Sequence, residues 1–102
     1  MASEKIFVCP PKGVPRTLVS EYLDRCHTNM PALKAALVQC EYEYARVFGH
    51  RIRGTGRAYG FPRLTEIGAV MEQAARLQQI GDLNDNVAAL EAYLSRVEIV
   101  GD

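Results

Sequence analysis

The residues with the clearest chemical potential lie around His50, where arginines and glycines follow closely. A neutral imidazole nitrogen is a competent nucleophile near pH 7, and phosphorylated imidazole is reactive enough to pass the group on. Arg53 and Arg57 lie one and two helical turns beyond it, where guanidinium groups can offset the charge of phosphoryl oxygens. We therefore expect His50 to accept a phosphoryl group that Arg53 and Arg57 stabilise.

Glycines beside His50 suggest that another protein must reach the ring. Gly54 lies one turn beyond His50 and carries no side chain to obstruct the in-line approach that phosphoryl transfer requires. Each interior glycine costs a helix ~1 kcal/mol, and local rules are often broken at functional sites. We expect Gly49 and Gly54 to give access and Arg46 and Val47 to contribute to docking. Val47 is also compatible with an ordinary surface position.

The periodicity around His50 predicts a helix from Glu41 to about Tyr59. At about 100° per residue, the side chains expected on its inner face point in one direction and His50 points in the opposite one. That inner face consists of Ala45, Phe48, Ile52, Thr55 and Tyr59. His50 should therefore face solvent from the middle of a rigid helix.

Residues 1–16 are rich in proline, which predicts an extended arm rather than a helix. Within it, Ile6–Val8 is short and apolar, and we expect it to pack on the helices rather than to form a sheet. The first helix then follows, with its inner face predicted at Leu18, Tyr22, Cys26, Met30, Leu33 and Leu37. Pro31 predicts a kink or a break, but the continuing apolar phase favours one kinked helix.

Two further helices are predicted after His50. Pro62 suits the first turn of the third helix, whose inner face comprises Leu64, Ile67, Met71, Ala74 and Ala75. We expect this helix to end at Gly81-Asp82, with Asp82 capping the last one. The apolar residues of that last helix are Leu83, Val87, Leu90, Leu94 and Val97. Short loops between amphipathic helices predict an all-α, antiparallel up-and-down four-helix bundle over residues 17–100.

The composition limits the classes of function. A chain of 102 residues with a formal net charge of zero is the length of one domain and has no overall attraction to nucleic acid or membranes. Its three cysteines form no CxxC pair, so neither a disulfide framework nor a metal site is predicted. No secretion signal and no run of ~20 apolar residues is present, so we expect a cytoplasmic protein.

The charges are unevenly distributed along this neutral chain. From Tyr44 to Thr65 there is no Asp or Glu, whereas arginines recur at positions 46, 51, 53, 57 and 63. The sequence therefore predicts a basic patch centred on His50.

The string from His50 to Phe61 resembles the signature of histidine-containing phosphotransfer (Hpt) domains, roughly H-x-x-K-G-x-x-x-x-x-G. His50 matches the phosphoacceptor, Arg53 the usual lysine, Gly54 the small residue that opens the surface, and Gly60 the final glycine. The helical pattern extends the resemblance over about Leu18 to Val97. Arg53 in place of lysine keeps the charge but changes its geometry, which bears on partner preference.

The resemblance implies a phosphocarrier in a two-component phosphorelay, without kinase activity of its own. Such a domain accepts the phosphoryl group from a receiver aspartate or a sensor histidine kinase and donates it to a response regulator. It holds no cofactor, because the Mg²⁺ used in transfer belongs to the receiver. We expect a monomer that binds neither nucleic acid nor membrane.

Two other functions stay open on the sequence alone. One is a docking bundle that binds receivers or kinases without carrying phosphate. The other is a small helical module that binds nucleic acid through the arginines, although the neutral net charge and the lack of interleaved aromatic residues weigh against it. His27 lacks neighbouring glycines, and we interpret it as structural or solvated.

Overall fold

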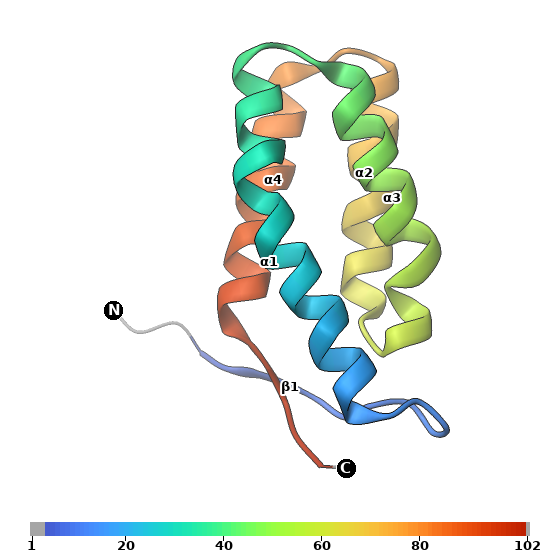
Figure 1. The fold of residues 1–102 in the computed structure, drawn as a ribbon. Helices are drawn as coiled ribbons and strands as arrows, with labels where there is room; N and C mark the ends of the chain where they lie inside the picture. The colour runs from blue at the N-terminus through green and yellow to red at the C-terminus, as the bar shows by residue number, and fades with distance from the viewer. Residues whose placement is uncertain (1–3, 102) are drawn as a thin grey trace.

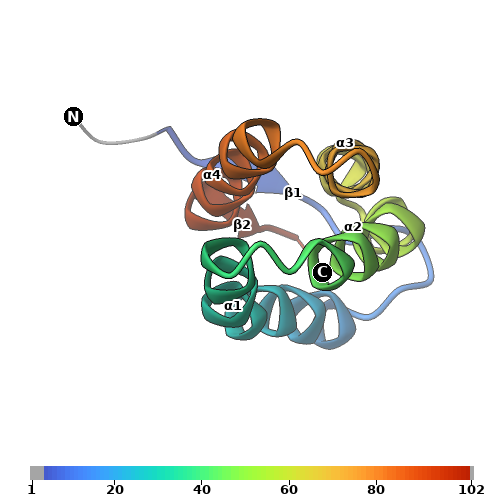
Figure 2. The same ribbon diagram turned by 90° about the horizontal axis from the view of Figure 1, so that it is seen from above.

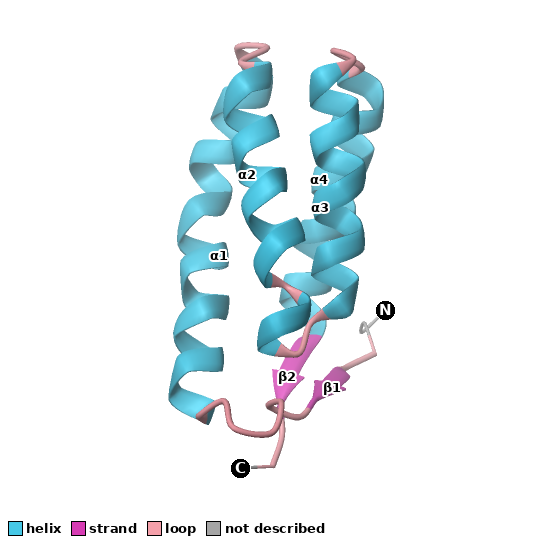
Figure 3. Ribbon diagram, turned by 90° about the vertical axis from the view of Figure 1, so that its right-hand side faces the viewer, coloured by secondary structure: helices cyan, strands magenta, loops and turns pink. Residues whose placement is uncertain are grey.

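The computed structural model describes residues 4–101, which form a bundle of four helices with two short strands at one end (Figures 1 and 3). The helices are α1 (Arg16–Val38), α2 (Tyr42–Thr55), α3 (Pro62–Arg76) and α4 (Ile80–Arg96). Figure 1 shows the chain rising along α1, descending along α2, rising along α3 and descending along α4. The predicted all-α class is confirmed. None of the helices between residues 4 and 101 is both long and apolar enough to cross a membrane.

All four helices contribute side chains to one core, around which Figure 2 shows them arranged in chain order. The largest fully buried side chains are Val19, Leu33, Phe61, Leu64, Ile67, Met71, Leu83 and Leu90. The predicted inner position of Leu18 is wrong, because Leu18 is 47% exposed and Val19 is fully buried. Val19 precedes Tyr22 and Leu23 by one turn, so it continues their buried face.

Pro31 does not break the first helix, since α1 runs from Arg16 through Pro31 to Val38. The expectation of one helix across this proline is confirmed. Its ring lies on the exposed side of α1, where the backbone has the most room to adjust.

The two ends of the chain form a small sheet that the sequence did not predict. Strand β1 (Ile6–Val8) pairs in parallel with β2 (Val97–Ile99), with Ile6 opposite Val97 and Val8 opposite Ile99. Both the expectation that Ile6–Val8 forms no sheet and the placement of Val97 in the last helix are therefore wrong. Ile6, Val8, Val97 and Ile99 are half-buried against the core, so pairing satisfies their backbone while the side chains cover the end of the bundle.

Side chains from the helices hold these strands in place. Arg16 donates hydrogen bonds to the carbonyl oxygens of Gly101 at 2.8 Å and Ile99 at 3.0 Å. Arg96 donates one to the carbonyl of Glu4 at 2.9 Å. Of the arm predicted for residues 1–16, residues 1–3 lie outside the described part of the structure.

Two predicted helix ends are displaced. The third helix ends at Arg76, and the turn to α4 is made at Leu77–Gln79 with Gln78 in the left-handed region at φ 55°. Gly81 and Asp82 therefore lie in the first turn of α4, where the Asp82 charge is favourable at the positive end of the helix dipole.

The second helix ends at Thr55 rather than near Tyr59, and a 3₁₀ turn, η1 (Arg57–Tyr59), follows it. The change occurs at Gly56, which is pressed against α3. A Cβ on Gly56 would lie 2.8 Å from the backbone nitrogen of Thr65.

Candidate functional site

Two glycines bring α2 and α3 into backbone contact beneath His50. A Cβ on Gly68 would lie 2.5 Å from the backbone nitrogen of Arg53 and 2.6 Å from the carbonyl oxygen of Gly49. A Cβ on Gly49 would lie 2.8 Å from the backbone nitrogen of Glu72. Because both glycines lack that atom, the helices approach closely enough for the carboxylate of Glu72 to reach the ring of His50.

His50 lies on the outer face of α2, and 60% of its side chain is exposed. Its Nδ1 is 3.1 Å from Oε2 of Glu72, which is hydrogen-bonding distance. Among residues 4–101 no hydrogen bond involves the second ring nitrogen, Nε2. The ring is thus held from one side and open on the other.

Glu72 is a buried carboxylate that is only 5% exposed, and the side chains of two arginines lie beside it. Nη1 of Arg53 lies 3.2 Å from its Oε1, and Nη2 of Arg76 donates to its Oε2 at 3.4 Å. The Arg53 contact is an ion pair without hydrogen-bond alignment, because Oε1 accepts no hydrogen bond. Burial raises the pKa of Glu72, but the hydrogen bond from His50 and the nearby arginines outweigh it, so the pKa lies below its ordinary value.

An ionised Glu72 accepts hydrogen bonds only, so Nδ1 of His50 must supply the proton between them. In the neutral ring the lone pair then resides on Nε2. In that neutral form the unprotonated nitrogen is the one on the open side of the ring, and the negative charge of Glu72 lies behind the ring, where it can balance a positive charge that develops on it. This arrangement suits nucleophilic attack by Nε2.

The structure places the predicted cationic residues unequally. The guanidinium of Arg53 lies 3.5 Å from Nδ1 of His50, at its edge. Arg57 lies in η1 beyond the end of α2, and no ion pair in residues 4–101 involves it. Arg46 forms two hydrogen bonds with Glu43, at 2.7 and 2.9 Å, and points its charge there.

The two glycines predicted to give access have different positions. A Cβ on Gly54 would meet nothing within 4 Å, so the surface beyond His50 is open there. Gly49 is buried against α3, and its assignment as an access residue is wrong. It serves close helix packing instead. Val47 is half-buried on α2 and borders a shallow surface hollow with Tyr44 and Arg51.

Sequence reasoning missed Glu72 and Arg76. Glu72 directly follows the inner-face residue Met71 and lies one helical turn after Gly68. An acidic residue next to the predicted inner face of the third helix was the feature that could have identified it. Glutamates, Glu72 among them, also lower the net positive charge around His50. The basic patch is partly neutralised, because Arg46, Arg53 and Arg63 pair with Glu43, Glu72 and Glu66.

Within residues 4–101 no group of His, Cys, Asp or Glu side chains is arranged to hold a metal ion. Cys9, Cys26 and Cys40 are free cysteines, of which only Cys26 is buried.

The sequence model of the Hpt domain family matches the chain over residues 17–99. Searches of curated proteins and of solved structures found no significant match. The match runs from the second residue of α1 to the end of β2 and includes His50. The chain therefore belongs to the Hpt domain family, whose members are phosphocarriers of two-component signalling.

Proposed function

We propose that this chain is a phosphorelay carrier that accepts a phosphoryl group on Nε2 of His50 and donates it to an aspartate of a response regulator. The group comes from a receiver aspartate or a sensor histidine kinase. The observation that carries the proposal is the exposed Nε2 opposite a Nδ1 that hydrogen-bonds the buried Glu72. Family membership supports the phosphotransfer role in general.

In the proposed step the lone pair of Nε2 attacks the phosphorus of an aspartyl phosphate. The bond between phosphorus and the aspartate oxygen breaks, and that oxygen leaves with the electron pair as a carboxylate. Nδ1 keeps its proton, so the phosphorylated ring is positively charged and Glu72 faces that charge at 3.1 Å. Donation is the same step reversed with another aspartate, and no proton need leave the ring.

The neighbouring residues have proposed supporting roles. Arg53 is close enough to the ring to swing toward phosphoryl oxygens, and its half-exposed side chain leaves it free to do so. Arg57 and Arg46 contribute longer-range attraction to the acidic site of a receiver. Gly54 leaves space for the incoming partner, and Val47 adds apolar contact area beside it.

We also propose that the carrier acts as a monomer in the cytoplasm. Free cysteines fit a reducing compartment. The nucleic-acid alternative is weakened by the ion pairs of Arg46, Arg53 and Arg63, which reduce the charge available to phosphates. The docking alternative differs from our proposal only in lacking transfer, so one experiment separates them.

The test is transfer of radiolabelled phosphate from phosphorylated receiver domains to the chain. The wild type should take up label that is stable in alkali and lost in acid. His50→Gln should take up none, and His27→Gln, which alters an exposed histidine on α1, should match the wild type. Label retained by His50→Gln would contradict the site. Binding without any labelling, across a broad panel of receivers, would establish the docking alternative instead.

A further inference from the structure

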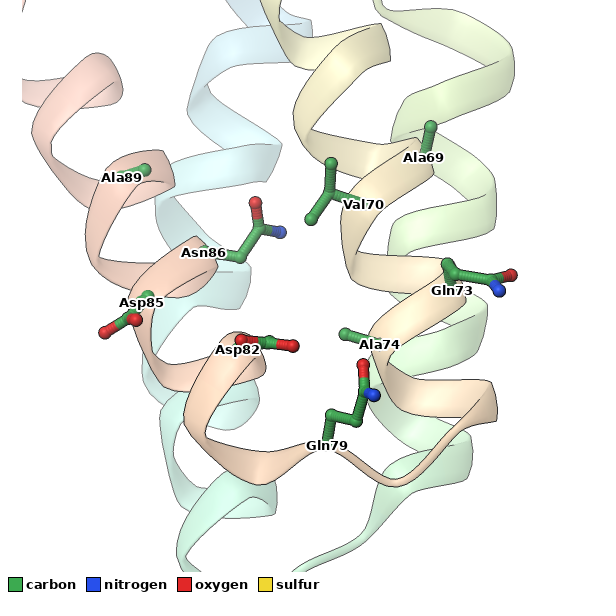
Figure 4. Close-up of a pocket in the computed structure, with 9 residues that line it drawn as sticks. All are labelled: Ala69, Val70, Gln73, Ala74, Gln79, Asp82, Asp85, Asn86 and Ala89. Carbon is green, nitrogen blue, oxygen red and sulfur yellow. The ribbon is translucent and has the colours of Figure 1, made fainter.

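A groove between α3 and α4 lies outside the His50 site. It has a volume of about 590 Å³ and includes no residue of α2 (Figure 4). We call it the α3/α4 groove. Glu72 and Arg76 of α3 do not border it, so its surface and the phosphotransfer site lie on different faces of α3.

The floor of the α3/α4 groove consists of small apolar side chains. Ala69 and Val70 line it from α3 and Ala89 from α4, and Ala74 closes it where the helices meet. Val70 is 53% exposed, so it presents apolar surface to solvent in the groove. Two helices lined with small residues form a trough into which the ridge of a third helix fits.

The charged groups around this floor are both carboxylates, and the other polar side chains that line it are the neutral amides Gln73, Gln79 and Asn86. Asp82 and Asp85 border the groove from α4, and neither forms an ion pair within residues 4–101. Figure 4 shows Asp82 directed toward Ala74 across the groove and Asp85 on the outer side of α4. No lysine, arginine or histidine lines the groove. No positively charged side chain of the groove therefore balances these carboxylates, and only Asp82 lies at the positive end of the α4 dipole.

Asn86 provides a further acceptor between the two helices. It is only 9% exposed, and its Nδ2 donates to the carbonyl oxygen of Ile67 at 3.0 Å. Its Oδ1 forms no hydrogen bond within the described part of the chain. Oδ1 is not among the enclosed, unsatisfied side-chain atoms of the described residues, so it is accessible in the groove to a donor from outside.

We propose that the α3/α4 groove docks a cationic amphipathic helix of a partner protein. Alanine and other small apolar side chains of that helix lie over Ala69, Val70 and Ala89. Its lysine or arginine side chains reach Asp82, Asp85 and the oxygen of Asn86. Docking here leaves His50 open, so a protein bound at the groove can hold the carrier while a receiver exchanges phosphate with it.

The probe is a designed helical peptide about 15 residues long, the length at which isolated helices begin to form, with leucine and alanine on one face and lysine on the other. Nuclear magnetic resonance of the ¹⁵N-labelled chain follows its titration. We expect saturable shifts of the amides of Ala69, Val70, Asp85 and Ala89 that weaken with salt. The same peptide with glutamate in place of lysine should cause none.

Asp85→Lys and Ala89→Trp should each weaken binding at least about tenfold, by charge reversal and by filling the groove. Asp85 lies beyond the first turn of α4, so its change spares the helix terminus that Asp82 stabilises. Asp24→Lys, on exposed α1 surface, and His50→Gln should bind as the wild type does, and circular dichroism verifies that each variant is folded. The proposal would be overturned if the glutamate peptide bound equally well or if the shifts were confined to other surfaces. It would also be overturned if both groove variants bound the lysine peptide with unchanged affinity. Shifts of the groove amides on dilution of the chain without peptide would also contradict it, because they would show that a second copy of this chain binds in the groove.

Discussion

The two ring nitrogens of His50 have different surroundings, and this difference governs its chemistry. Nδ1 hydrogen-bonds a carboxylate that is buried and held by two arginines, whereas Nε2 faces solvent. The buried carboxylate favours the tautomer with the proton on Nδ1 and orients the ring, and in the proposed transfer it would balance the charge that phosphorylation creates.

Glu72→Ala should slow phosphoryl uptake by about 10- to 100-fold, because a hydrogen bond to a charged group contributes roughly 1.5–3 kcal/mol. Glu72→Gln should fall between Glu72→Ala and the wild type, since its amide oxygen still accepts from Nδ1–H but carries no charge. Stopped-flow or quenched transfer kinetics with one phosphorylated receiver measures both. The exposed Glu66→Gln on the same helix is the matched control, and equal rates for all of them would remove Glu72 from the mechanism.

A substitution at Gly54 should change the stability of the fold and the rate of phosphoryl transfer in opposite directions. Gly54→Leu should raise helix stability by up to ~1 kcal/mol, because nothing lies within 4 Å of its Cβ position and leucine favours helix. The same side chain should slow transfer by up to about 10²-fold, because it stands where a receiver must approach. Thermal unfolding measures the change in stability, and transfer kinetics with a phosphorylated receiver measure the change in rate. Undiminished transfer in a stabilised variant would show that this surface need not be open.

At the scale of the helices, α2 and α3 form the rigid platform of the site. Their contact at Gly49 and Gly68 is between backbones, which leaves little freedom for one helix to shift against the other. The distance between His50 and Glu72 is therefore set by helix packing and not only by the two side chains.

Gly68→Ala should destabilise the bundle by about 1–3 kcal/mol despite the better helix propensity of alanine, because its Cβ would meet backbone atoms 2.5 and 2.6 Å away. Chemical denaturation measures the loss. Gly81→Ala on α4 is the control, since a Cβ there meets nothing within 4 Å and should be neutral or stabilising. A Gly68→Ala variant as stable as Gly81→Ala would show that the close contact is not needed.

Elements whose pattern is local were predictable, and those that depend on distant partners were not. The outward direction of His50 follows from its angle to Phe48 and Ile52 within one helix. Glu72 could not be placed without knowing how α2 packs on α3. A glycine inside a helix is equally compatible with surface access and with close packing, which is why Gly49 was assigned wrongly.

The two strands also depend on a distant partner and could not be predicted from a local sequence pattern. Ile6–Val8 is too short to show alternation, and its partner Val97–Ile99 lies at the other end of the chain. The helical phase of α4 also continues into Val97, so periodicity alone could not end the helix at Arg96. Only pairing between the chain ends determines both.

At the scale of the whole molecule, strands β1 and β2 pair at one end of the bundle (Figure 1). His50 lies in the interior of α2, away from both ends of that helix. The chain has a net charge of zero but two differently charged surfaces. One holds the arginines around His50, which glutamates partly neutralise, and the other holds Asp82 and Asp85 of the α3/α4 groove, which form no ion pair among residues 4–101. A carrier organised in this way can present separate faces to separate proteins.

Stability should depend on pH through Glu72. Its pKa is lowered in the folded state, so its contribution is complete above the ordinary glutamate range, about pH 4–5, and is lost as the pH falls through the folded value. The wild type should therefore lose more unfolding free energy than Glu72→Gln between pH 7 and pH 3. Urea denaturation at a series of pH values measures this, and parallel curves for the two proteins would contradict it.

The most direct measurement is nuclear magnetic resonance of the phosphorylated, ¹⁵N-labelled chain, in which coupling to ³¹P identifies the ring nitrogen that bears phosphorus. We expect the coupling at Nε2 of His50, with Nδ1 still carrying its proton beside Glu72. Phosphorus on Nδ1, or on any residue other than His50, would contradict this.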